Sequence, residues 1–416
     1  MKRILVISEL FYPTNRIGAL RPSKICKFLI EKGYDVDIIT AYPAQGIYES
    51  KNSKVYSIYK TTFSPNISIQ ETRWKKINNN FVNQLRYFKR TFFFYLKEKK
   101  YTRKVFKLFK NEILNIENYD ACFTTYGPIS SVLIGLKLKK RYHIKNWICD
   151  FRDPIAGKMC SMFMYPFYKH LQNQSCKYAD KIVAVSNGYL QRICKDKYQK
   201  KAYMIPNGYD VSDKNYSFVQ YRKNKFVLTY VGTLYEGKRD VSPIFRAISE
   251  LNFDGSIDIN NVSFVYAGTD FASLLAQAEK YSMQNILENK GSLSREACLK
   301  IQYESTILVL STWNERGEEG VFPGKFLEYM LIGKPIISLT CGNLSNSEVT
   351  SVMQEGNFGV AYESANDEKD FSALKNYIKK SYDLFLRTGN IPFEPKQEVL
   401  ERYSYTTIMK RIEELL

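Results

Sequence analysis

The chain has 416 residues, a formal net charge of +19, 44% hydrophobic residues and 15% aromatic residues. This length exceeds that of most single hydrophobic cores, so we expect two domains, and the composition excludes a disordered or fibrous protein. The surplus of positive charge indicates an anionic partner: a nucleic acid, an acidic membrane surface or a phosphorylated ligand.

Three further classes lack support in the sequence. The longest apolar runs, such as residues 307–310, are far shorter than the ~20 residues that span a bilayer. The N-terminus leads directly into a strand, without the apolar region and cleavage site of a signal peptide. The eight cysteines are scattered and form no Cys-x-x-Cys pair. We therefore expect neither a zinc site nor a disulfide framework, and a reducing, cytoplasmic environment.

The first half of the chain alternates strands with helices. Apolar runs predict strands at residues 4–8, 36–40, 121–125, 147–151 and 182–185, and the spacing over 20–31 predicts a helix that ends near Gly33. Strands that alternate with helices favour a parallel sheet covered on both faces. Because crossovers between parallel strands are right-handed, this sheet is expected to be doubly wound.

The same pattern begins again in the second half, with strands predicted at 226–231, 262–267, 307–310 and 336–339. The sequence thus predicts an α/β protein with two doubly wound, Rossmann-like domains facing across a cleft. We place the N-terminal domain at 1–206, a linker at 207–225 and the C-terminal domain at 226–395. A final helix at 396–416 can pack back on the N-terminal domain.

Two polar stretches follow strands of the N-terminal half. Gly18 opens a helix, so backbone N–H groups there can meet an anion, although a helix entry that needs glycine is an equally good explanation. Asp150, Arg152 and Asp153 come at the end of a strand, just before Pro154. Groups of this kind suit a reaction site, and the alternative is an internal pair between Arg152 and one of the aspartates that fixes the loop.

A loop in the second half has the composition of a diphosphate site. After the strand at 226–231 the chain passes Gly232 and Gly237 and reaches Lys238 and Arg239. Small residues allow close approach of the backbone to phosphate, and the cations balance its charge. The segment contains neither the Walker pattern nor G-x-G-x-x-G, so standard ATPase and dinucleotide assignments are weak.

A second candidate anion site begins the helix predicted between Pro323 and Gly333. Gly324 and Lys325 lie at its start, where the helix dipole favours an anion. Glu328 follows one turn later on the same side. Its carboxylate either pairs with Lys325 or accepts hydrogen bonds from a ligand such as a ribose diol.

These segments resemble the GT-B glycosyltransferases of family 4, which are retaining and depend on nucleotide sugars. The resemblance covers nearly the whole chain, and its specific parts are 230–240 together with 320–335. Individually weaker matches lie at 4–8, 15–21, 184–187 and 205–210.

The resemblance implies roles for individual residues. It assigns the diphosphate to Lys238 or Arg239 with Lys325, and the nucleotide ribose to Glu328. The candidate catalytic residues are Asp150, Arg152, Asp153, Lys238 and Lys325. The candidate nucleotide-sugar-binding residues are Gly18, Gly232, Thr233, Arg239, Glu319, Gly320, Gly324 and Glu328.

The sequence departs from the family pattern at two positions. The family often has a glutamate eight residues before the second one, and this chain has Gly320 there, with Glu318 and Glu319 out of register. The family also often has a histidine in the N-terminal cleft loop, where this chain has Arg-Asp. We expect His143 and His170, the two histidines of the chain, to be structural.

The expected mechanism needs no metal and no cofactor other than the donor. Lys238, Arg239, Lys325 and helix N–H groups can stabilise the charge that develops on a departing nucleoside diphosphate. The Asp-x-Asp match at 35–37 begins a buried strand, so it does not predict a metal site.

Much of the positive charge lies between residues 71 and 110, where thirteen Lys and Arg face only two Glu. Aromatic residues are interleaved with these cations. A basic helix of this kind is typical of membrane surfaces, so we expect residues 73–110 to contact an anionic membrane. The alternatives are an ordinary helix with a solvated basic face and a nucleic-acid surface, where bases stack on rings.

Together, these patterns predict a glycosyltransferase, peripheral at the inner face of a membrane. It would move a sugar from a nucleotide donor to a lipid-linked or other glycan acceptor in the synthesis of surface polysaccharides such as capsule or O-antigen. The alternatives are a GT-B nucleotide-sugar epimerase and a basic nucleic-acid-binding protein with a degenerate cleft, and we do not expect nucleic acid as the partner.

Overall fold

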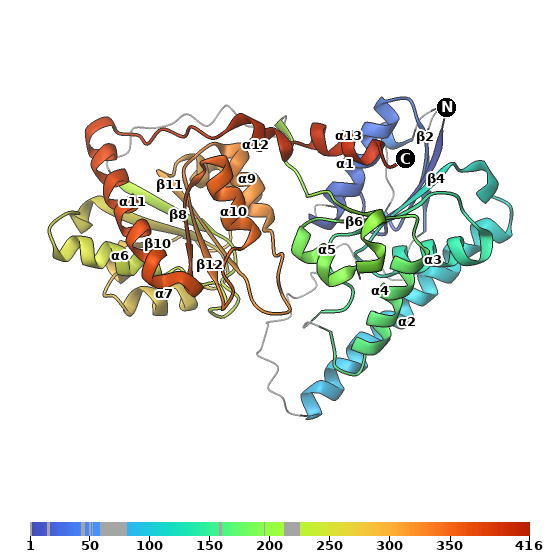
Figure 1. Cartoon of the computed structure of the whole chain (residues 1–416), viewed down its shortest axis with the longest axis horizontal. Coiled ribbons are helices and arrows are strands. Elements are labelled where there is room, and N and C mark those ends of the chain that lie inside the picture. Colours follow the sequence, from blue (N-terminus) through green and yellow to red (C-terminus); the bar gives the residue numbers. More distant parts are fainter. Residues whose placement is uncertain are drawn as a thin grey trace. The chain divides into compact units, whose positions relative to one another are not determined.

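The computed structural model describes residues 2–14, 17–42, 46–49, 51, 53–58, 81–157, 160–194, 196–211 and 225–416 (Figure 1). The chain forms two compact units. Unit 1 contains Met1–Asn207 and Tyr405–Leu416, and unit 2 contains Gly208–Ser404. Much of the expected linker at 207–225 lies outside the described residues.

Unit 1 is built on a parallel sheet with the strand order β3-β2-β1-β4-β5-β6-β7 in the part of the chain that the structure describes. The strands are β1 (Arg3–Ile7), β2 (Asp35–Thr40), β3 (Ser53–Ser57), β4 (Ala121–Thr125), β5 (Trp147–Phe151), β6 (Lys181–Ala184) and β7 (Ala202–Met204). The helices are α1 (Ile17–Glu31), α2 (Phe81–Lys110), α3 (Ser130–Tyr142), α4 (Tyr165–Tyr178), α5 (Asn187–Ile193) and α13 (Tyr405–Glu413).

The alternation of side chains along β1 explains the two cores of unit 1. Leu5 and Ile7 belong to a core with buried residues of α2, α3 and α4. Ile4 and Val6 point to the other face and belong to a core with α1 and α13. Helices therefore cover both faces of the sheet, because successive residues of a strand point to opposite sides.

Unit 2 repeats this arrangement with the order β10-β9-β8-β11-β12-β13, again parallel throughout its described strands. Its strands are β8 (Phe226–Val231), β9 (Val262–Ala267), β10 (Leu287–Asn289), β11 (Ile307–Trp313), β12 (Ile336–Cys341) and β13 (Gly359–Glu363). Its helices are α6 (Ser242–Phe253), α7 (Phe271–Glu279), α8 (Arg295–Tyr303), α9 (Gly324–Ile332), α10 (Glu348–Gly356), α11 (Asp367–Thr388) and α12 (Gln397–Arg402). One core lies beneath α6, α7 and α11, and the other beneath α9, α10 and α12.

The fold class predicted from the sequence is confirmed as α/β with two parallel sheets. The expected terminal helix at 396–416 is wrong in one respect, because the chain breaks it at Tyr403 and Ser404 into α12 and α13. Val399 of α12 packs in unit 2, whereas Ile408 and Ile412 of α13 pack in unit 1. Among the described residues, the structure has no helix that is both long and apolar enough to cross a membrane.

Candidate active site

Each sheet reverses its strand order at one point. In unit 1 the chain first moves from β1 outward to β3 and then returns to β4, beside β1; in unit 2 the same reversal separates β8 from β11. At such a point the loops after the two strands diverge to opposite faces, and ligands bind between them at the carboxyl edge. Most of the candidate residues predicted from the sequence lie in these loops or in the helices that follow them.

In unit 2 the two loops meet through an ion pair. Lys238, in the loop after β8, pairs through its Nζ with a carboxylate oxygen of Glu318, in the loop after β11. The Lys238 Nζ also lies 4.3 Å from the ring centre of Trp313, the last residue of β11. The side chains of Lys238 and Glu318 are 32% and 11% exposed. The cation is therefore partly exposed but already has an anionic partner.

Arg239 lies beside this pair and keeps one hydrogen-bond donor unused. Its Nη1 donates to the Thr233 carbonyl oxygen at 3.1 Å. Its guanidinium carbon lies 4.8 Å from the Tyr235 ring centre and 5.5 Å from that of Trp313. The Nε of Arg239 and the indole Nε1 of Trp313 are buried and have no hydrogen-bond partner among the described residues.

Helix α9 begins with open backbone donors. Pro323 occupies the N-cap position, and no side chain caps the helix there. Gly324 is exposed, and no other atom lies within 4 Å of the place where its Cβ would be. Within this turn the Phe326 N–H donates to the Pro323 carbonyl oxygen at 3.0 Å. The N–H groups of Gly324 and Lys325 have no acceptor one turn earlier in the helix, so this end can receive an anion.

Lys325 and Glu328 form the local pair that the sequence left as one of two possibilities. The Lys325 Nζ donates to Glu328 Oε1 at 2.6 Å, and the two side chains are 34% and 20% exposed. Both carboxylates at this site, Glu318 and Glu328, thus neutralise a candidate phosphate-binding lysine. A phosphate bound at either lysine would have to displace that carboxylate.

A buried tyrosine of α9 links the helix to strand β11. Tyr329 donates from its hydroxyl to the Val309 carbonyl oxygen at 3.2 Å. Burial raises the pKa of Tyr329, and the neighbouring Glu328 raises it further, whereas Arg239 opposes the shift.

Two of the predicted glycine and glutamate positions have local structural roles. Gly320 has φ +83°, a left-handed conformation that favours glycine. Glu319 accepts a hydrogen bond from the Gly317 N–H at 2.9 Å and so closes a turn within its own loop. Sequence reasoning assigned no role to Trp313 or Glu318. The predicted strand stopped at the apolar run, whereas β11 continues through buried Ser311 and Thr312 to Trp313.

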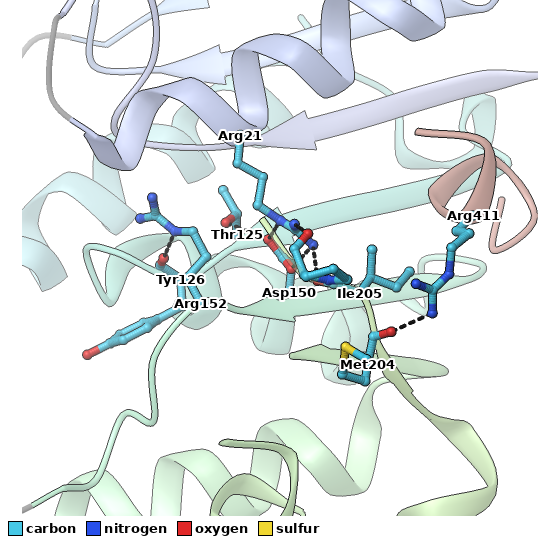
Figure 2. A network of polar contacts seen from close by, with 9 residues as sticks. Arg21, Thr125, Tyr126, Asp150, Arg152, Met204, Ile205 and Arg411 are labelled. Atoms are coloured by element: carbon cyan, nitrogen blue, oxygen red, sulfur yellow. Dashed lines mark hydrogen bonds and ion pairs between the residues drawn. The ribbon is translucent and has the colours of Figure 1, made fainter. Parts of the chain in front are cut away.

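In unit 1, Asp150 is the centre of a buried network (Figure 2). Its two carboxylate oxygens each accept from the Arg21 guanidinium at 3.0 Å, and Thr125 Oγ1 donates at 2.9 Å. Arg21 also donates to the carbonyl oxygens of Ile205 and Pro206. Asp150 is 0% exposed and Arg21 1%. The predicted contact of Asp150 with substrate is therefore wrong for this structure, because both oxygens are engaged inside the unit.

Arg152 holds two loops of unit 1 together. It donates to the carbonyl oxygen of Tyr126 at 2.8 Å (Figure 2). It also donates to the carbonyl oxygens of Gly18 at 2.5 Å and Gly127 at 3.1 Å. A Cβ at Gly127, where φ is +114°, would collide with this guanidinium. The sequence suggested, as an alternative, that an ion pair between Arg152 and an aspartate fixes this loop. In the structure, hydrogen bonds from Arg152 to backbone carbonyl oxygens fix it instead. Arg152 positions the loops that begin α1 and α3.

Of the two aspartates of unit 1 that the sequence suggests as site residues, Asp153 is the one that lies at the surface. The residue is exposed, yet protein atoms surround its carboxyl group. This desolvation raises the pKa of Asp153, whereas Arg152, a hydrogen bond from Tyr189 and Arg192 oppose the shift. His143, in contrast, caps the end of α3, and His170 is an exposed residue of α4.

No protein-family model and no curated protein sequence matches the chain. Solved structures match over its whole length. A trehalose 6-phosphate synthase from Burkholderia multivorans is 11% identical, covers 100% of this chain and 96% of its own, and has a TM-score of 0.63. Sucrose-phosphate synthase from Thermosynechococcus elongatus is 14% identical, and the match covers 100% of this chain and 98% of the synthase, with a TM-score of 0.59.

The lipopolysaccharide outer core galactosyltransferase WaaB in its apo form is also similar, with 14% identity, coverage of 100% and 99%, and a TM-score of 0.55. Identities at this level establish the architecture alone. The two parallel, doubly wound sheets and these structural neighbours lead to one conclusion: the chain has the GT-B fold of glycosyltransferases.

Proposed function

We propose that the protein is a glycosyltransferase whose unit 2 binds the diphosphate of a nucleotide sugar. The observation that carries this proposal is the meeting of two loops at the strand-order reversal of unit 2, where Lys238, Arg239 and the start of α9 supply cations and N–H donors. The names of the structural neighbours, two sugar-phosphate synthases and a galactosyltransferase, support glycosyl transfer as the reaction.

In this proposal the donor exchanges partners with the two glutamates. One phosphate replaces Glu318 at Lys238, and the other lies at the N–H groups of α9 beside Lys325. Glu328, released from Lys325, accepts a hydrogen bond from a ribose hydroxyl. Arg239 Nε and Trp313 Nε1 are buried donors without a partner among the described residues. In this proposal they bond to phosphate oxygens or sugar hydroxyls once the bound donor has rearranged the two loops.

The chemistry follows the retaining pattern that the family 4 resemblance implies. The bond between the anomeric carbon and the phosphate oxygen breaks, and its electron pair stays on the phosphate. The acceptor oxygen forms its new bond to the anomeric carbon on the same face, and its proton passes to the departing phosphate. Lys238, Arg239, Lys325 and the α9 N–H groups stabilise the leaving charge, so the reaction needs no metal ion. Asp153 orients a hydroxyl of the sugar or the acceptor.

The charge of unit 1 supports an acceptor held at a membrane. Unit 1 contains 40 Lys and Arg against 16 Asp and Glu, whereas unit 2 contains 21 against 26. The whole positive surplus therefore belongs to the unit that carries α2. We propose a lipid-linked glycan as the acceptor and the anionic, cytoplasmic face of a membrane as the place of reaction.

A panel of nucleoside diphosphates and nucleotide sugars tests the donor site. We expect one nucleotide to raise the Tm of the protein and to bind in calorimetry, and Glu328→Ala to weaken that binding about tenfold by removing the ribose acceptor. Glu355→Ala, which removes a carboxylate elsewhere in unit 2, is the matched control. The proposed function is refuted if no nucleotide of the panel binds, and the role of Glu328 if its variant binds like the wild type.

A further inference from the structure

Helix α2 carries an apolar stripe that the fold leaves open. Leu85, Phe92 and Leu96 are spaced so that they share one side of the helix, and they are 45%, 40% and 41% exposed. Farther along, Tyr101, Val105 and Phe106 are buried in the core of unit 1. In Figure 1 the first half of α2 extends away from the sheet of unit 1.

A tight turn before α4 adds two more apolar side chains. The N–H groups of Met164 and Tyr165 both donate to the Ser161 carbonyl oxygen at 2.9 Å. Ser161 and Met164 are buried, at 0% and 5% exposure, whereas Met162 is 62% and Phe163 42% exposed. The turn is thus anchored at both ends and holds the side chains of Met162 and Phe163 outward.

Ring contacts join this turn to the stripe on α2. The ring centres of Phe88 and Phe163 lie 5.7 Å apart in an edge-on arrangement, and Phe88 stacks on Phe92 at the same distance. Behind them, Tyr95 contacts Phe167 of α4 at 4.7 Å. The stripe and the turn therefore form one apolar surface, which we call the α2 wedge, defined by Leu85, Phe92, Leu96, Met162 and Phe163.

Positive charge surrounds the wedge on α2. Arg86, Lys89, Arg90, Lys97 and Lys100 are all exposed. The helix contains one acidic residue, Glu98, which is 0% exposed, so α2 presents no negative side chain to solvent. Apolar residues bordered by cations match the boundary between the acyl chains and the anionic headgroups of a lipid leaflet.

The chemistry of the wedge favours lipid over nucleic acid. Bases stack on aromatic rings and bind to cations, but Leu85, Leu96 and Met162 offer no flat surface for stacking. Acyl chains, in contrast, accept aliphatic and aromatic side chains alike. Electrostatic attraction alone would not require two large apolar side chains held outward on an anchored turn.

We infer that the α2 wedge inserts into the hydrocarbon of an anionic bilayer, and that it does so beside the loop which carries Arg152 and Asp153. Phe163 follows Asp153 by ten residues in the same connection between β5 and α4. Insertion would hold a lipid-linked acceptor near that loop. This last step rests on the proposed function, whereas insertion itself does not.

Fluorescence provides a direct test. The chain has three tryptophans of its own, so the wild-type spectrum is subtracted from that of each variant. We expect the difference spectrum of Phe163→Trp to shift to shorter wavelength when vesicles of phosphatidylglycerol and phosphatidylcholine are added, and to be quenched by lipids brominated along the acyl chain. Phe253→Trp is the matched control, because Phe253 is 94% exposed but belongs to unit 2. An unchanged Phe163→Trp spectrum under conditions where the protein cosediments with vesicles would overturn the inference.

Binding of the wild type and of two variants separates insertion from charge. The double variant Met162→Ser/Phe163→Ser should partition at least tenfold more weakly into vesicles than the wild type at high salt, where insertion dominates binding. The double variant Lys89→Gln/Arg90→Gln should partition more weakly mainly at low salt, because salt screens the attraction that it removes. Binding of the wild type that high salt abolishes, or binding to oligonucleotide without binding to vesicles, would refute the wedge. The nucleoside diphosphate affinity of the serine variant should stay at the wild-type value, so loss of vesicle binding and failure of the donor site give different results.

Discussion

The ion pair between Lys238 and Glu318 leads us to expect that removing a charged residue from the site strengthens nucleotide binding instead of weakening it. In the proposed donor complex a phosphate takes the place of Glu318 at Lys238, and the displaced carboxylate stays close to the new anion. Glu318→Gln removes both the competition for Lys238 and this repulsion. We therefore expect the variant to bind the nucleoside diphosphate more strongly than the wild type.

The exposure of the pair sets the magnitude. Two unit charges about 3 Å apart attract by about 5 kcal/mol at an effective dielectric constant near 20, and hydration offsets most of this. An exposed ion pair contributes about 0–1 kcal/mol to the free energy of unfolding. Removal of one partner of a fully buried pair lowers that free energy by about 3–5 kcal/mol. With side chains 32% and 11% exposed, Lys238 and Glu318 lie between these limits. A net competition of about 1–2 kcal/mol corresponds to a Kd lowered roughly 5- to 30-fold.

Calorimetry with the nucleoside diphosphate that the panel selects would measure this change, at low ionic strength and with unfolding curves to verify the fold. Glu355→Gln is the matched control, because Glu355 pairs with Arg402 elsewhere in unit 2 and its loss changes the net charge equally. An equal or higher Kd for a folded Glu318→Gln protein would refute the exchange of partners at Lys238. It would instead favour a role for Glu318 in holding the loop in its binding conformation.

Three further predictions concern the remaining site residues. Lys325→Ala should lower kcat more than it raises KM, because the leaving group gains charge in the transition state; steady-state kinetics showing an effect on KM alone would contradict this. Arg21→Leu should lower the free energy of unfolding by about 3–5 kcal/mol, since it leaves the Asp150 carboxylate buried without its cation, and a loss below about 1 kcal/mol in urea unfolding would refute a buried ionised pair. Burial raises the pKa of Asp153 in the folded protein above its value of 3.8 in the unfolded chain. As the pH rises above 3.8, the unfolded chain therefore loses this proton before the folded protein does, and the free energy of unfolding falls. Asp153→Asn should therefore stabilise the protein more at pH 7 than at pH 4, and equal Tm differences at both values would exclude the shift.

The central strands of both sheets could be predicted from the amino-acid sequence alone. Strands such as β1, β4 and β8 are covered by helices on both faces, so their residues form nearly continuous apolar runs that stand out locally. The four strands that it missed, β3, β7, β10 and β13, are the edges of the two sheets. Edge strands are short or partly polar because one side lacks a partner strand, and β10, with Leu287, Glu288 and Asn289, has no apolar run at all.

The sequence also identified the loops that form the candidate site, because glycine next to lysine after a strand is a local pattern. Which charged residues pair with one another, in contrast, became evident only in the folded protein. Glu318 pairs with a lysine 80 positions away, and Asp150 with an arginine 129 positions away. The local pattern of residues does not indicate which segments far apart in the sequence come together. The order of the strands in the sheet decides this, because it places the loops after β8 and β11 side by side. For the same reason Asp150 suggested a reacting group in the sequence and proved to be a buried partner of Arg21 in the fold.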